Sequence, residues 1–313
     1  MKAVVLHSFG PASNFRYETV PDPEPGPGQV RIVVKAIGVH LVETMMRQGM
    51  TGALPPLPEL PSIFGGEVSG TVDSVGPGVD ASWIGRDVVT NAGKPGGYAE
   101  LAVADLAALY PVPEGLSHET AVAMIVTGTT TLQFLDVARL TPDDVVLVTS
   151  AAGGIGRLLV QYAKGLGATV IGAAGGPAKV AAVRELGADV AVDYNEPSWE
   201  KGLEPTVVLD GVGGEKARAA YSTLVDGGRY LSIGDASQEG YAPVPERGIS
   251  VTNALLLLLE RWEDVPRFAA ASLAAAAEGR LVPAVQTFPL AEAAAAHEAL
   301  AARRTTGKVV LIP

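Results

Sequence analysis

The sequence predicts an α/β protein that combines a mostly antiparallel, barrel-like β domain with a doubly wound parallel sheet. Residues 1 to about 120 are rich in Pro, Gly and short Val/Ile runs, which is typical of a closed antiparallel β domain. From about Leu116 onward, helix and strand patterns alternate, as they do in a parallel sheet with covering helices. A glycine-rich turn at 150–156 lies directly between a strand pattern and a helix pattern.

The first part of the chain contains short strand patterns separated by turn residues. A proline-rich stretch over 49–61 is expected to be a loop bordering a cleft. The expected strands are 1–6, 29–37, 68–75 and 87–90.

The second part begins with a helix that starts at Ser117. The strands expected after it are 145–149, 168–173, 190–193, 206–209 and 228–233. The helices expected between them are 156–166, 178–186 and 215–224.

The C-terminal part is expected to return to the first domain. Helices are predicted over 264–278 and 290–303, and the final residues, 307–313, form a strand pattern that can rejoin the first sheet. The predicted domains are therefore 1–122 with 264–313, and 123–263.

Composition and charge narrow the classes of function. The 313 residues are 48% hydrophobic and 18% charged, as in a soluble globular protein, and the net charge is −11. This charge disfavours nucleic acid and anionic membranes as partners. The absence of cysteine excludes disulfides, thiolate zinc sites and cysteine nucleophiles. The N-terminus lacks a signal-peptide pattern, and the apolar run 254–259 is too short to span a bilayer, so we expect a cytoplasmic protein.

The turn at 150–156 predicts a phosphate site. It follows a β-branched strand pattern and opens a helix, so its backbone N–H groups and the helix N-terminus are available to an anion. The pyrophosphate of a dinucleotide is the expected ligand of Ala152, Gly153, Gly154, Ile155 and Gly156.

The order of motifs resembles the zinc-free quinone oxidoreductase family of the medium-chain dehydrogenase/reductase superfamily. The matching motifs extend over almost the whole chain: 38–44, 64–70, 75–78, 96–100, 127–129, 150–156, 186–189, 296–300 and 306–310. The resemblance implies a GroES-like catalytic domain, a Rossmann domain, and NADPH-dependent reduction of quinones or enones.

The resemblance also bears on metal binding. Zinc-dependent relatives have Cys and His ligands where this chain has Val39 and Gly66. The four histidines are separated in sequence and form no HExxH pair. We therefore expect no metal, and hydride transfer to an already activated acceptor fits better than alcohol oxidation.

The cofactor predicted from these residues is NADPH. NAD-binding Rossmann domains carry an acid near the end of the second strand, whereas this chain has Ala173 and Ala174 there, followed by Gly175 and Gly176 where the family often has Ser. Lys179 and Tyr194 match family positions that contact the 2′-phosphate. The alternative is that Lys179 is a solvated helix residue and Tyr194 a surface aromatic.

Other cofactor contacts follow from the topology and from the family. Ligands bind beyond the carboxyl ends of parallel strands, and tight turns without ligand contact are the alternative for the glycines. Candidates from the topology are Gly172, Ala173, Gly211, Val212, Ile233 and Gly234. In the family, Thr127 lies near the nicotinamide or its ribose, and residues 251–253, ending at Asn253, approach the nicotinamide ring.

The catalytic residues are less clearly marked. No nucleophile–base pattern is present, and solvent can protonate a reduced quinone. His40 replaces the Asn usual in the family, and Met45 replaces a residue that can be Tyr. With Thr127 they are the candidate substrate-pocket residues, and His40 is the candidate proton or hydrogen-bond donor to the substrate carbonyl. A structural histidine and an ordinary methionine core are the alternatives.

The predicted function is NADPH-dependent, zinc-independent hydride transfer to a quinone or another α,β-unsaturated carbonyl compound. Two alternatives remain open: an enoyl-thioester reductase of the same superfamily and a non-catalytic NADPH-binding redox sensor. The family commonly pairs subunits through an edge strand of the Rossmann sheet, so a homodimer is expected, with 229–233 and the segment after it as candidates for the contact.

Overall fold

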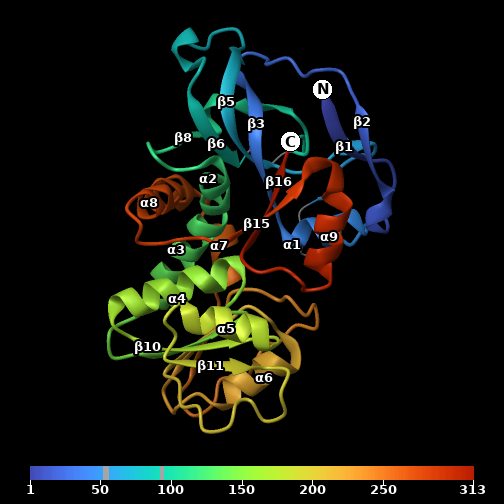
Figure 1. Cartoon of the computed structure of the whole chain (residues 1–313). Coiled ribbons are helices and arrows are strands. Elements are labelled where there is room, and N and C mark those ends of the chain that lie inside the picture. The colour runs from blue at the N-terminus through green and yellow to red at the C-terminus, as the bar shows by residue number, and fades with distance from the viewer. Residues whose placement is uncertain (52–55, 92–94) are drawn as a thin grey trace. The chain divides into compact units, whose positions relative to one another are not determined.

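The computed structural model describes residues 1–51, 56–91 and 95–313. The chain forms two compact units, one of residues 1–126 and 284–313 and one of residues 127–283. Figure 1 shows the first unit in blue, cyan and red and the second mainly in green, yellow and orange. The proline-rich loop expected over 49–61 includes residues 52–55, which lie outside the described residues.

The first unit is built on two sheets, both mostly antiparallel. The smaller has the order β2–β1–β4. The larger has the order β15–β16–β3–β5–β6–β8, and β7 also pairs with β3. The strands are β1 (Lys2–Leu6), β2 (Phe15–Thr19), β3 (Gln29–Val39), β4 (Ser62–Ile63), β5 (Glu67–Val75), β6 (Asp87–Asn91), β7 (Leu101–Asp105), β8 (Leu109–Pro111), β15 (Val285–Pro289) and β16 (Lys308–Ile312).

The C-terminal strand returns to this first sheet, as the sequence predicted. Val310 of β16 pairs with Gly38 of β3 in an antiparallel ladder. Val30, Ile32 and Val34 alternate along β3 into the core, because successive strand residues point to opposite faces. The helices of this unit are α1 (Leu41–Arg47), α2 (His118–Ile125) and α9 (Ala293–Ala301), with short 3₁₀ turns at Ala12–Asn14, Ala81–Trp83, Leu106–Ala108 and Leu290–Glu292.

The second unit is a six-stranded parallel sheet in the order β11–β10–β9–β12–β13–β14. This is the strand order of a Rossmann fold, in which the chain reverses direction across the sheet between the first and fourth strands. Here those strands are β9 and β12. The strands are β9 (Val145–Thr149), β10 (Thr169–Ala174), β11 (Val190–Asp193), β12 (Val207–Asp210), β13 (Arg229–Ser232) and β14 (Ser250–Asn253).

Helices cover both faces of this parallel sheet. Val146 and Val148 of β9 pack in one core with residues of α3, α4 and α5, while Leu147 packs on the other face against α6. The strand is therefore apolar throughout, as a doubly covered strand must be. The helices are α3 (Thr127–Ala138), α4 (Gly154–Leu166), α5 (Pro177–Glu185), α6 (Gly214–Ser222), α7 (Ala254–Glu260) and α8 (Val265–Ala277), with a 3₁₀ turn at Trp262–Asp264.

Two expectations about organisation differ from the structure. The second unit extends to Pro283 rather than to residue 263, because α8 packs against α3. The expected edge strand at 229–233 is wrong, because β13 lies between β12 and β14. The strand Ser250–Asn253, which the sequence analysis did not identify, forms the edge on that side of the sheet, and β11 forms the other edge.

Among the described residues, one helical stretch is long and apolar enough to be tested as a membrane span. Residues 118–138, which contain α2 and α3, include an 18-residue window with a mean hydropathy of 1.4, and 72% of that window is buried inside the protein. Such burial is typical of a core helix, so this stretch is weak evidence for a membrane span.

Candidate functional site

The glycine turn joins β9 to α4 in the geometry of a phosphate loop. Ser150 adopts a left-handed backbone conformation with φ of 56°, and Gly153 is the N-cap of α4 without a side-chain cap. A Cβ on Gly156 would overlap the backbone carbonyl oxygen of Ser150. Glycine at 156 therefore allows the first turn of the helix to lie directly on the loop.

This arrangement leaves the start of α4 available to an anion. The first N–H groups of a helix have no partner within the helix, and among the described residues no side chain caps those of α4. The first bond of the helix runs from the N–H of Arg157 to the carbonyl of Gly153. The N–H groups of Gly154, Ile155 and Gly156 thus precede the hydrogen-bonded ladder, at the positive end of the helix dipole.

No carboxylate side chain comes directly after β10 in the sequence. Gly175 and Gly176 lead into α5, where Lys179 lies in the first turn. A Cβ on Gly175 would come within 2.9 Å of the ring of Tyr194 and 3.1 Å of the Asn195 amide. The departure from Ser at this loop therefore has a packing reason, since Tyr194 lies over the glycine.

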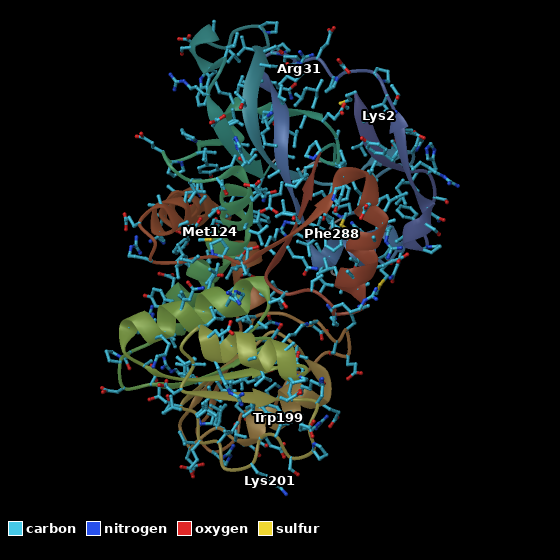
Figure 2. All side chains as sticks on the ribbon, in the orientation of Figure 1. Lys2, Arg31, Met124, Trp199, Lys201 and Phe288 are labelled. Atoms are coloured by element: carbon cyan, nitrogen blue, oxygen red, sulfur yellow. The ribbon has the colours of Figure 1, made fainter. Side chains whose placement is uncertain are left out.

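Tyr194 is held in place from several sides. Its N–H donates to the carbonyl of Ala174, and its ring packs edge-on against Trp199, with centroids 6.4 Å apart; Trp199 is labelled in Figure 2. Lys216 of α6 places its ammonium 3.9 Å from the centre of the Tyr194 ring. Sequence reasoning missed Lys216, because its place depends on how α6 packs against the sheet, which no local pattern indicates.

Two of the expected cofactor residues lie within the sheet. Gly172 and Ala173 are buried in the interior of β10, and a Cβ on Gly172 would overlap the side chain of Val183 in α5. Gly172 therefore serves the close packing of α5 on the sheet. Ala173 accepts a hydrogen bond from the N–H of Ala151 and so anchors the glycine turn.

Asp210 organises the loop that follows β12. Its buried carboxylate accepts bonds from the N–H groups of Val212 and Gly213 and from the hydroxyls of Thr149 and Tyr230, at 2.6 and 3.0 Å. The loop that begins at the expected cofactor residue Gly211 is thus fixed beside the end of β9.

The remaining residues expected at the cofactor lie at the ends of strands or the start of a helix. Gly234, which follows Ile233, lies close to Gly211. A Cβ added to Gly234 would be 3.3 Å from the carbonyl oxygen of Gly211. The side chain of Asn253 caps α7 by accepting from the N–H of Leu256 at 3.1 Å. Thr127 begins α3 and is 8% exposed.

In the first unit, His40 belongs to a cluster of three charged or titratable side chains. The imidazole Nε2 lies 2.7 Å from Glu67 Oε2, and the Lys308 ammonium lies 2.6 Å from the same oxygen. The three residues come from the ends of neighbouring strands β3, β5 and β16. Glu67 and Lys308 are buried, with 1% and 5% of their side chains exposed, whereas His40 is 26% exposed.

The charge of Glu67 is stabilised by its neighbours. Burial alone raises the pKa of this carboxyl, but Lys308 and His40 outweigh burial and lower the pKa to about 2. Gly38 makes room for the pair, since a Cβ there would overlap the Glu67 carboxylate. The Glu43 carboxylate accepts a hydrogen bond from the backbone N–H of His40 at 2.8 Å and so fixes the backbone of this residue.

A buried polar chain supports Glu43. The hydroxyl of Tyr98 donates to Glu43 Oε2 at 2.9 Å and lies 2.9 Å from Nε2 of His297. Burial raises the pKa of Glu43, and burial together with the Arg47 guanidinium lowers the pKa of His297 to about 3. His297 is therefore neutral at neutral pH and can donate from Nε2 to the tyrosine hydroxyl.

The methionines proposed for the substrate pocket lie in α1 and in the turn after it. Met45 is buried in α1 and 9% exposed, and Met46 packs against the core of the first unit, which supports the interpretation of these residues as core. Met50 follows at the end of the turn after α1. Within residues 1–51, 56–91 and 95–313, no group of three His, Cys, Asp or Glu side chains gathers as metal ligands.

Comparisons with known proteins agree with this geometry. The model of the alcohol dehydrogenase GroES-like domain matches residues 26–114, and the zinc-binding dehydrogenase model matches residues 186–311. A quinone oxidoreductase of Pseudomonas aeruginosa is 32% identical over 100% of this chain and 99% of the relative. A 2-haloacrylate reductase of a Burkholderia species is 32% identical over 99% of this chain and 98% of the relative.

A solved structure extends the agreement to three dimensions. The quinone oxidoreductase of Thermus thermophilus, described together with its NADPH complex, is 35% identical, with a TM-score of 0.82 and 100% of both chains covered. The fold, the order of the motifs and these relatives lead to one conclusion: the chain is a quinone oxidoreductase-like reductase and belongs to the quinone oxidoreductase family of the medium-chain dehydrogenase/reductase superfamily.

Proposed function

We propose that this protein uses NADPH to reduce quinones or other α,β-unsaturated carbonyl compounds, without zinc. The observation that carries the proposal is the end of β10. An NAD-specific domain needs a carboxylate there for the ribose 2′-hydroxyl, and this chain has Gly175 and Gly176, with Lys179 in the following helix turn and Tyr194 packed beside the glycines.

The residues present fit a dinucleotide phosphate. The uncapped N-terminus of α4 and the close approach permitted by Gly156 suit a pyrophosphate. Lys179 and Tyr194 are the proposed 2′-phosphate ligands. Thr127, Gly211, Val212, Gly234 and Asn253 are proposed contacts for the rest of the cofactor. When bound, the reduced nicotinamide supplies a hydride equivalent.

The chain's own contribution at the acceptor is a polar anchor. His40 exposes part of its imidazole while Glu67 and Lys308 hold the ring from the buried side. Nε2 faces Glu67 and Lys308, so Nδ1 is the ring nitrogen that remains for the carbonyl oxygen of the acceptor. With a proton on Nδ1, the ring can donate a hydrogen bond to that oxygen, where negative charge develops on reduction. The zinc-ligand positions are Val39 and Gly66, so an acceptor that is already electron-poor suits this site.

A comparison of acceptors and cofactors tests the proposal. Oxidation of NADPH and of NADH is followed with quinones, enones, 2-haloacrylates and enoyl thioesters. We expect turnover with NADPH and quinones or enones, and several-fold slower turnover with NADH. In Lys179→Ala, the KM for NADPH should rise several-fold while that for NADH changes little. Faster turnover with NADH would contradict the cofactor assignment, and a clear preference for enoyl thioesters would identify a different acceptor class.

The proposal includes a cytoplasmic homodimer. The acidic net charge of −11 is that of a soluble protein, and the edge strand β14 presents a row of backbone groups suited to pairing with a second subunit. Light scattering on the purified protein measures the mass directly, and a monomer at micromolar concentration would contradict this part of the proposal.

A further inference from the structure

We propose that Lys216 is a second cationic contact for the 2′-phosphate and helps to set the preference for the phosphorylated cofactor. This inference rests on the proposed function, because it concerns the same nucleotide site. The observation that supports it is the position of Lys216 on α6. No pattern in the sequence predicts that α6 lies near the end of β10.

The position of the ammonium is defined by two neighbouring residues. Lys216 Nζ lies 3.9 Å from the centroid of the Tyr194 ring and donates to Asn195 Oδ1 at 2.6 Å. Both Tyr194 and Asn195 follow β11, and both lie against Gly175 at the end of β10. Lys216 therefore reaches the strand end at which an NAD-binding domain places its acid.

The surroundings of the ammonium favour an anionic ligand. Within the part of the chain that the structure describes, the ammonium contacts a neutral amide oxygen and a ring face. Burial lowers the pKa of Lys216, and the charge of Asp193 only partly opposes this effect. An ammonium that is partly removed from water gains more from a phosphate than a fully solvated lysine does.

The loops beside Lys216 are held in place by Asp193. Asp193 is already engaged, because its carboxylate accepts from the N–H groups of Gly176 and Asn195 at 2.9 Å. These bonds fix the loops after β10 and β11 against each other. Lys216 then lies on one side of the Tyr194 ring, and an anion beside Gly175 would meet both the lysine and the tyrosine.

Arg218 provides a matched control. It lies two residues further along α6, carries the same charge and is 64% exposed, and its guanidinium stacks over Tyr241, 5.4 Å from the ring centroid. Arg218→Gln therefore removes one positive charge from the same helix without touching Tyr194. Any effect of net charge alone should be equal in Arg218→Gln and Lys216→Gln.

Direct binding to the cofactor-free protein tests the inference. The affinities for 2′,5′-ADP and for 5′-AMP, which lacks the 2′-phosphate, are measured by calorimetry at fixed salt. We expect Lys216→Gln to weaken 2′,5′-ADP binding about tenfold and 5′-AMP binding less than twofold, as for the loss of one charge-assisted contact. Lys216→Arg, which keeps the charge, should restore most of the affinity, and Arg218→Gln should match the wild type.

The outcomes separate this inference from the proposed function. If the wild type binds 2′,5′-ADP no better than 5′-AMP, the cofactor assignment itself is wrong, and the role of Lys216 is wrong with it. If the wild type discriminates but Lys216→Gln discriminates equally well, only the role of Lys216 is refuted. Equal losses for both ligands would also refute it. Circular dichroism of each variant shows that the fold is retained.

Discussion

At the scale of single residues, His40 is the side chain whose role is most open to experiment. It lies where the resemblance to the family implies an asparagine, and the structure shows what holds the ring: Glu67 and Lys308 both contact it from the buried side. The sequence indicated His40 as a candidate but gave no reason to connect it with Lys308, because 268 residues separate the two.

We predict that His40→Phe raises the KM for the acceptor about tenfold, since a ring remains but both ring nitrogens, and with them every hydrogen bond of the imidazole, are lost. The KM for NADPH should change little. His40→Asn restores a donor of the kind that is usual in the family and should recover much of the loss. Steady-state kinetics with one quinone measures all three enzymes, and equal KM values for His40→Phe and the wild type would show that His40 only packs.

His297 makes stability depend on pH. Its pKa is lowered to about 3 in the folded protein from the ordinary 6.5, so between these values the unfolded chain binds the extra proton. The contribution of His297 to the free energy of unfolding is therefore fully present above pH 6.5 and is lost as the pH falls below that value. Between pH 6.5 and 5 the loss amounts to about 2 kcal/mol. The raised pKa of Glu43 acts in the opposite direction.

The contribution of His297 is isolated by comparison with His297→Gln. Urea unfolding of both proteins from pH 7.5 to 5 should show the wild type losing about 2 kcal/mol more than the variant. Glu67, whose pKa is lowered from the ordinary 4.5 to about 2, causes a further loss of stability only as the pH falls below 4.5 toward 2. This range lies outside the pH range of the experiment. Parallel pH profiles for the two proteins would mean that His297 titrates normally.

At the scale of elements, the strand–turn–helix unit from β9 to α4 is where sequence and structure agree most closely. The strand is predicted by its β-branched residues and the turn by its glycines, both of which are local signals. What the sequence left open is which glycine is essential. The structure distinguishes Gly156, which touches the loop backbone, from Gly165, which has no atoms within 4 Å of an added Cβ.

We predict opposite effects for two glycine-to-alanine changes in α4. Gly156→Ala places a methyl group against the carbonyl of Ser150, which cannot move aside, so stability should fall and binding of 2′,5′-ADP should be lost. Gly165→Ala adds a methyl group in open space and should stabilise the protein by up to about 1 kcal/mol. Thermal unfolding and calorimetry measure both, and a stable, nucleotide-binding Gly156→Ala protein would contradict the geometry.

Other elements were harder to predict. The helix α1 lies in a segment with strands and turns on both sides, and its N-terminus depends on Glu43 reaching back to the His40 N–H. The strand β14 is only four residues long and its place is set by pairing with β13. Short elements of this kind are stabilised by tertiary pairing more than by local preference.

At the scale of the whole molecule, the first unit depends on the last residues of the chain. β16 lies between β15 and β3 in the sheet and supplies Lys308. The sequence predicted that this strand rejoins the first sheet, and the register from Val309 to Leu311 confirms it.

We predict that a protein truncated after Thr306 loses the fold of the first unit, because two strands lose their neighbour and Glu67 loses its ion-pair partner. Limited proteolysis should then cut within residues 1–126, whereas removal of the exposed Pro313 alone should have no effect. Protease resistance of the truncated protein equal to that of the full chain would show that β16 is dispensable.

The sequence by itself determined the fold class, the glycine turn, the absence of thiol chemistry and the candidates Lys179, Tyr194 and His40, because local patterns and residue types carry these properties. Only the tertiary structure brought Lys308 to Glu67 and His40, placed Lys216 over Tyr194, and made β14 rather than β13 an edge of the parallel sheet. Such contacts join residues far apart in the chain, and they depend on strand order and helix packing, which no local pattern records.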